Sequence, residues 1–128
     1  MEKESKRQKQ MGETVKRHFS TVLQQQGGNI YGFEVLVTVT EVKMTPDLGL
    51  AKIYLSIYNT ENKEAVLLQM ETARNELRQN LAHRLRKHAR RVPNIDFYID
   101  ETIDEMYRVN ELFNRLDKDN QMGEEEES

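Results

Sequence analysis

Residues 64–100 decide the fold, because a helical and a strand periodicity follow one another in EAVLLQMETARNELRQNLAHRLRKHARRVPNIDFYID. In the first part, apolar residues recur at spacings of three and four, as on the buried face of a helix. These residues are Val66, Met70, Ala73, Leu77, Leu81 and Leu85. Pro93 disfavours a helical residue before it. Apolar and polar residues then alternate from 95 to 99, which predicts a strand.

The polar side of this helix is strongly basic. Residues 74–91 contain seven arginine and lysine residues and one acidic residue, a local charge of +6, whereas the whole chain carries −3. The seven are Arg74, Arg78, Arg84, Arg86, Lys87, Arg90 and Arg91. Clustered cations favour a phosphate backbone as the partner, because each neutralised phosphate releases condensed counterions. The same residues also suit an ordinary solvated helix face, and the charge alone does not separate the two interpretations.

The phase of the helix limits how far it can continue as a straight rod. At the normal helical pitch, Arg84 and Arg91 would return to the apolar face, where an unpartnered guanidinium is costly to bury. Either the helix bends, or its end projects beyond the sheet. Between Leu85 and Val92 no apolar residue is larger than alanine, so we expect a projecting, exposed cationic end.

Length and composition describe one small domain. A chain of 128 residues can bury a modest core, and it contains no cysteine, which excludes disulfides and thiolate chemistry. No apolar run approaches the length of a membrane span. The basic N-terminus is not followed by the apolar segment of a secretory signal. We therefore expect a cytoplasmic protein.

We divide the chain into three parts. Residues 1–10 are expected to form a basic, flexible N-terminus, residues 11–116 a folded domain, and residues 117–128, ending in GEEEES, a disordered acidic tail. Residues 92–128 contain three basic and twelve acidic side chains, a net charge of −9. The two signs of charge are therefore segregated along the chain, although the overall charge is small.

The remaining elements complete an α+β domain. A helical stripe begins at Met11 and is predicted to end at Gly27-Gly28, since glycine permits the left-handed conformation at a helix end. Alternating residues on both sides of the turn sequence at 45–49 predict an antiparallel hairpin. The long helical crossover then places the third strand parallel to the second. A last helix is expected at 103–116.

No constellation in the sequence predicts catalysis. The acidic residues at 100–105 stand at a helix start, where they suit the helix dipole better than a metal ion. His83 and His88 are five residues apart and lie on different helix faces, and His18 is expected at the surface. We therefore predict no catalytic, metal or cofactor site. Tyr54 and Tyr58 share one strand face, where stacking on bases and plain packing or exposure remain open as interpretations.

Three segments together resemble the ribosome-binding factor A family of bacterial small-subunit assembly factors. They are VTEVKMTPDLGLAKIYLSI, ETARNELRQNLAHRLRKHARRVPNIDFYIDET and EMYRVNELFNRL, and the resemblance spans about residues 6–116. It implies a type II KH-like RNA-binding domain over residues 11–116, with a three-stranded sheet covered by helices on one face. It also implies a helix kink at Ala73-Arg74-Asn75, where Asn75 stands in place of the family's glycine.

The resemblance further implies binding to the free, immature 30S subunit through 16S rRNA, assistance to late rRNA maturation and processing, and support of growth in the cold. It implies a monomer that is not an enzyme and takes no small-molecule substrate. We expect the seven basic residues of 74–91 to contact phosphates, with RNA shape supplying specificity. A second basic patch comprises Lys6, Arg7, Lys16 and Arg17. The alternative is a non-ribosomal protein-interaction adaptor that uses the open sheet edge and the acidic tail.

Overall fold

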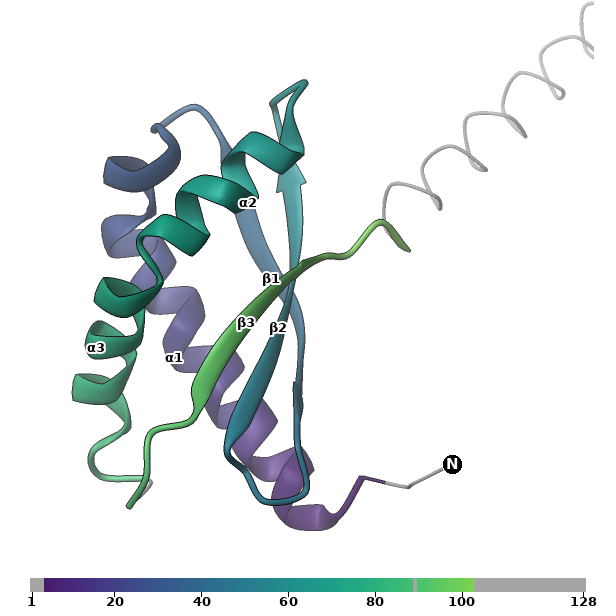
Figure 1. The fold of residues 1–128 in the computed structure, drawn as a ribbon, viewed down its shortest axis with the longest axis vertical. Helices are drawn as coiled ribbons and strands as arrows, with labels where there is room; N and C mark the ends of the chain where they lie inside the picture. The colour runs from purple at the N-terminus through teal and green to yellow at the C-terminus, as the bar shows by residue number, and fades with distance from the viewer. Residues whose placement is uncertain (1–3, 89, 103–128) are drawn as a thin grey trace, which may run out of the picture.

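Three helices and three strands form a two-layer α+β domain in residues 4–88 and 90–102, which the computed structural model describes. Their order is α1 (Lys6–Tyr31), β1 (Leu36–Met44), β2 (Leu50–Tyr58), α2 (Lys63–Thr72), α3 (Arg74–Leu85) and β3 (Asn94–Ile99). These helices lie on one face of the sheet and leave its other face open (Figure 1). The predicted fold class is confirmed. The helix expected at 103–116 and the acidic tail lie outside the described residues.

The sheet has the strand order β1-β2-β3, with β2 in the middle. β1 runs antiparallel to β2 and β3 runs parallel to it, as the hairpin and the helical crossover predict. A bulge interrupts β1: Val39 pairs with Leu55 and Glu41 with Tyr54, so Thr40 is the extra residue. The bulge moves the inward face of β1 from odd to even positions, which is how both Val39 and Met44 come to be buried.

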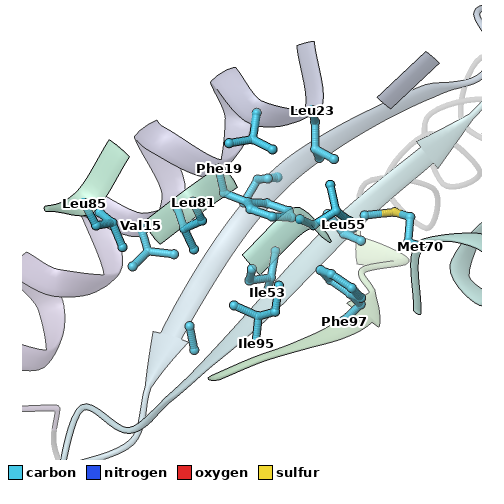
Figure 2. Packing of buried hydrophobic residues seen from close by; sticks show 14 of the residues in the cluster. Val15, Phe19, Leu23, Ile53, Leu55, Met70, Leu81, Leu85, Ile95 and Phe97 are labelled. Atoms are coloured by element: carbon cyan, nitrogen blue, oxygen red, sulfur yellow. The ribbon is translucent and has the colours of Figure 1, made fainter. Parts of the chain in front are cut away.

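The core lies between the sheet and the helices (Figure 2). Phe19 of α1 and Phe97 of β3 place their ring centroids 5.8 Å apart, and Leu55 of the central strand is fully buried. The stripe predicted in residues 64–91 is also inside, since its members other than Ala73 are at most 3% exposed. Each large apolar side chain buried in this way contributes about 1.5–3 kcal/mol, so the shared core holds every described helix to the sheet.

α1 begins earlier than the sequence predicts. The Ser5 hydroxyl accepts from the Gln8 backbone N–H at 3.1 Å, and the Gln8 side chain accepts from the Ser5 N–H at 2.7 Å, a reciprocal capping box. The Gln8 side-chain amide also donates to the Met44 carbonyl at 2.9 Å, which anchors this first turn to the end of β1. Residues 6–10 are therefore helical, and the expectation of a flexible segment is wrong for them.

α1 also ends later than predicted, at Tyr31 rather than at Gly27-Gly28. The left-handed residue beyond the helix is Gly32, with a φ of 101°. The two inner glycines instead make room for aromatic rings, because a Cβ at Gly27 would meet Tyr31 and one at Gly28 would meet Phe33. Both glycines lie inside the helix, so their interpretation as a stop signal is wrong.

The long helix is broken at Ala73 into α2 and α3, as the resemblance implied. Ala73 has φ −91° and ψ 11°, outside the regular helical range, and its N–H donates to the Gln69 carbonyl at 3.2 Å. Asn75 lies inside α3 without a left-handed backbone, so this break needs no glycine there. The new direction resets the helical phase, and Arg84 is exposed beside fully buried Leu85.

α3 ends at Leu85, so the projecting helical end that we expected is wrong. Residues 86–88 form a turn, and Arg90 and Arg91 lie in a bend before β3. The break at Ala73 has already removed the conflict of phase that motivated the projection. The basic residues after Leu85 are presented by a loop instead of a helix.

The turn between β1 and β2 forms where the sequence places it. The Leu48 N–H donates to the Thr45 carbonyl at 2.8 Å, and the Thr45 N–H donates to the Leu50 carbonyl at 3.0 Å. The left-handed residue of this turn is Leu48, with a φ of 59°. The turn closes the end of the sheet next to the first turn of α1.

Candidate nucleic-acid interface

One end of the molecule brings together basic residues that lie far apart in the sequence. Three segments lie at the same end of the molecule, the lower end in Figure 1, near the label N. They are the start of α1, the turn after β1, and the end of α3 with its following loop. The hydrogen bond from Gln8 to Met44 joins the first two segments. The Asn94 N–H donates to the Gly49 carbonyl at 2.9 Å and joins the turn to the loop. We call the exposed cations of these segments the basic end: Lys6, Arg7, Lys9, Arg84, Arg86, Lys87, Arg90 and Arg91.

The middle of α1 packs against the end of α3 and extends the basic surface along the molecule. The ring centroids of His18 and His88 lie 5.2 Å apart. Burial lowers the pKa of His18, and the nearby charges of Arg84, Arg17 and His88 lower that pKa further. Exposed Arg17 and half-buried Lys16 belong to the same helix. Cations from two helices thus face one another, and a polyanion bound over them would relieve their repulsion.

Within residues 4–88 and 90–102, the cations after residue 83 are not paired with carboxylates. In the described part of the chain, no salt bridge is formed by Arg84, Arg86, Lys87, Arg90 or Arg91. Hydrogen bonds from Thr45 and Gly49 lower the pKa of Asp47, and the charge of Arg91 adds to this effect. Among the described residues these cations are exposed to solvent, where guanidinium and ammonium groups can donate to phosphate oxygens.

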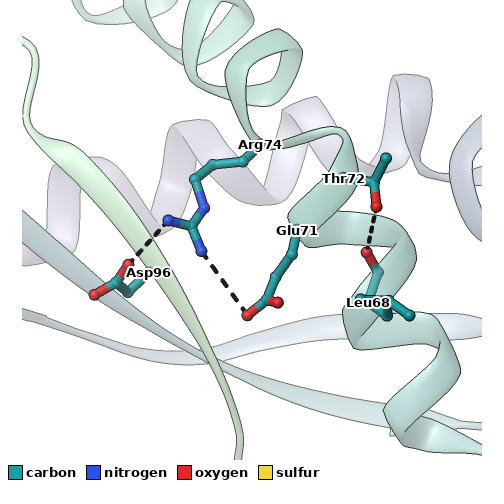
Figure 3. A network of polar contacts seen from close by, with 5 residues as sticks. All are labelled: Leu68, Glu71, Thr72, Arg74 and Asp96. Atoms are coloured by element: carbon teal, nitrogen blue, oxygen red, sulfur yellow. Dashed lines mark hydrogen bonds and ion pairs between the residues drawn. The ribbon is translucent and has the colours of Figure 1, made fainter.

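Arg74 differs from these cations because its guanidinium is engaged within the protein. Its guanidinium lies 3.4 Å from a carboxylate oxygen of Asp96 and 3.8 Å from one of Glu71 (Figure 3). Its Nε is buried and has no hydrogen-bond partner among the described residues. Arg74 therefore braces the start of α3 against β3, and its charge is already compensated.

Arg78 is also used within the protein. Its Nε donates to the Pro93 carbonyl at 3.2 Å, and its Nη2 donates to the Val92 carbonyl at 3.1 Å. These two bonds fasten the end of the basic loop to the side of α3. Arg78 thus supports the loop that carries Arg86, Lys87 and their neighbours, and its phosphate contact stays a prediction.

Residues 4–88 and 90–102 contain neither a cluster of metal ligands nor a candidate membrane-spanning helix. No three His, Asp or Glu side chains of this part gather closely enough to hold a metal ion. Within the same ranges, no helix combines the length and the apolar character that crossing a bilayer requires. What the basic end offers a ligand is positive charge at a spacing held by the fold.

The sequence model of the ribosome-binding factor A family matches residues 7–113. The chain belongs to this family. Ribosome-binding factor A of Cytophaga hutchinsonii is 32% identical over 113 residues, which cover 88% of this chain and 84% of that protein. Ribosome-binding factor A of Prosthecochloris aestuarii is 38% identical over 101 residues, covering 73% of this chain and 81% of that protein.

Structures of ribosome-binding factor A share the fold. The crystal structure of the protein from Thermus thermophilus has a TM-score of 0.60 at 24% identity and covers 72% of this chain and 94% of that chain. A homology model of the Thermus thermophilus protein, fitted into the cryo-EM map of a 30S complex, has a TM-score of 0.56 at 26% identity. It covers 70% of this chain and 90% of that chain. The α-β-β-α-β order with a broken helix is thus the fold of ribosome-binding factor A.

Proposed function

We propose that this protein is a non-enzymatic assembly factor that binds the free 30S ribosomal subunit through 16S rRNA. The observation that carries the proposal is the basic end, whose exposed cations form no salt bridge with the described carboxylates. Clustered, uncompensated cations favour a phosphate backbone. Membership of the ribosome-binding factor A family supports the same partner, as does the 30S complex of the related Thermus thermophilus protein.

The basic end acts as a rigid set of phosphate contacts. Gln8 holds the start of α1 to β1, and Arg78 holds the loop before β3 to α3, so the two groups of cations keep their spacing. Phosphate contacts position a protein without reading sequence. Specificity then comes from the shape of the folded rRNA, which must present phosphates at matching positions.

Binding of this kind assists late 16S rRNA maturation while other enzymes process the precursor ends. The work takes place in the cytoplasm on the free small subunit. Acidic residues 117–128 oppose the basic end in charge and discourage binding to unrelated RNA. In this proposal the protein supplies position and charge, and no bond is made or broken by its side chains.

Sedimentation with purified free 30S subunits tests the proposal. The full chain should travel with 30S particles through a sucrose gradient, and the fraction bound should fall as salt is raised. With about five phosphates neutralised, the logarithm of affinity should fall against the logarithm of salt concentration with a slope of about −4. A slope near zero, or a protein that stays at the top of the gradient, contradicts the proposal. The adaptor alternative predicts the second result together with protein partners that survive nuclease treatment.

A further inference from the structure

The sheet face that the described helices leave open carries two stacked aromatic rings. Tyr54 of β2 and Tyr98 of β3 pair directly across the parallel strands. Their ring centroids lie 5.3 Å apart with 26° between the planes. We propose that this face binds single-stranded RNA by stacking a base on these rings. The inference rests on the proposed function, because it adds a second contact to the same rRNA partner.

The rings form a stack with one end closed and one end open. The Lys43 Nζ lies 5.5 Å from the centroid of the Tyr54 ring, a cation–π contact on the β1 side. Tyr98 is 40% exposed and belongs to β3, an edge strand of the sheet. A base can therefore extend the series Lys43, Tyr54, Tyr98 by lying on the exposed Tyr98 ring. Stacking of this kind tolerates any base, because every base has a π-face.

Lysines connect this stack to the basic end. Lys43 and Lys52 pair across β1 and β2, between the row of tyrosines and the turn at 45–49. That turn lies at the basic end, where the charge of Arg91 acts on Asp47. A strand whose phosphates are held at the basic end can thus pass over the two lysines and place a base on the rings.

Carboxylates on this face determine which part of the nucleotide meets the rings. Asp96 is paired with Arg74, and Asp100 accepts from the Thr40 hydroxyl at 2.6 Å. Glu41 is exposed opposite Tyr54. Negative charge beside the rings disfavours a phosphate directly above them, whereas an uncharged base is accepted. The face is therefore suited to bases, and the basic end to phosphates.

Binding of a fluorescein-labelled ten-nucleotide oligouridylate to the full-length protein tests the inference by fluorescence anisotropy. Tyr98→Ala should weaken binding by about tenfold or more, the loss expected when one stacked base is removed. Tyr98→Phe keeps the ring and should bind within about twofold of the natural protein. Leu68→Ala is the matched control, because Leu68 is a large exposed apolar residue on α2, on the helix side of the molecule.

Three results overturn the inference. The first is equal affinity of Tyr98→Ala and the natural protein, and the second is equal loss in Tyr98→Ala and Tyr98→Phe. The third is a dimer of the natural protein in sedimentation velocity that Tyr98→Ala dissociates, because the face then binds a second copy of the chain.

Sedimentation with 30S subunits separates the two proposals. If the protein binds 30S subunits but its binding of oligouridylate does not depend on Tyr98, only the stacking site is contradicted. If its binding of oligouridylate depends on Tyr98 but it does not bind 30S subunits, only the proposed function is contradicted.

Discussion

Arg74 Nη1 lies 3.4 Å from Asp96 Oδ1, so the first turn of α3 is tied to the middle of β3 across the edge of the sheet. Both side chains are a little more than one-third exposed. An ion pair this accessible is screened by water, and we expect Arg74→Gln to lower the free energy of unfolding by at most about 1 kcal/mol. Urea titration followed by circular dichroism measures this change.

The same Arg74→Gln variant should bind 30S subunits as well as the natural protein does. Its charge is compensated by Asp96 and Glu71, so little counterion release is lost with it. Sedimentation at several salt concentrations checks this expectation. A large loss of affinity in a stable Arg74→Gln protein would show that the guanidinium leaves its carboxylates when RNA binds.

Arg84 and Arg86 should behave in the opposite way, because both are exposed and form no salt bridge in the described residues. The double variant Arg84→Gln/Arg86→Gln should make the salt slope of 30S binding shallower by about 2, one for each lost phosphate contact. Binding at a fixed, moderate salt concentration should fall accordingly. The circular dichroism spectrum should stay unchanged, since neither side chain packs in the core.

A matched control separates local charge from net charge in that experiment. Gln24→Glu/Gln25→Glu also changes the net charge by −2, at exposed positions of α1 toward its other end. This control should retain the salt slope of the natural protein. Equal losses in the two double variants would mean that only the overall charge matters, and the basic end would lose its role as a defined surface.

Much of the fold could be predicted because local chemistry determines it. Pro46 and Asp47 favour a turn when they lie between two segments of alternating residues. A long helical crossover favours a parallel arrangement of the strands that it connects, here β2 and β3. The ends of α1 could not be predicted in the same way. Whether Gly28 stops a helix or makes room for a ring depends on Phe33, which comes near it only after the chain has turned. The bulge at Thr40 likewise depends on tertiary partners, Tyr54 and Asp100.

The sequence indicates where the basic segment of the candidate site lies, but not which of its cations are engaged within the protein. Composition indicates that residues 74–91 are basic, but it does not show which cations have internal partners. Arg74 and Arg78 are held by Asp96 and by backbone carbonyls before β3, contacts that depend on where the helix breaks. Lys9 was missed, although its i, i+3 spacing from Lys6 places both on one face of the capped helix.

Stability should depend on pH through His18. Burial lowers its pKa below the ordinary value of 6.5, and the charges of Arg84, Arg17 and His88 act in the same direction. Below about pH 6.5 the unfolded chain binds a proton at this residue that the folded protein takes up only at lower pH. The free energy of unfolding should therefore fall as the pH is lowered from about 7.5 toward about 5.5.

The variant His18→Gln checks the assignment of this pH dependence. Urea titrations at a series of pH values should show a smaller decrease for His18→Gln than for the natural protein. His83→Gln removes an exposed imidazole of α3 and should leave the decrease unchanged. If both variants reduce it equally, the contact between α1 and the end of α3 is not its source.

Gly12 allows α1 to approach β1 closely, and the same substitution at two glycines should show it. A Cβ at Gly12 would lie 2.7 Å from the Val42 carbonyl oxygen, a backbone atom that cannot move alone. We expect Gly12→Ala to lower the melting temperature, because overpacking of about 1–3 kcal/mol exceeds the gain of about 1 kcal/mol in helix propensity. Gly28→Ala meets only the ring of Phe33, which is 84% exposed and free to rotate, so that variant should match or exceed the natural stability. Stabilisation by both substitutions would mean that α1 can move away from β1 without loss of packing.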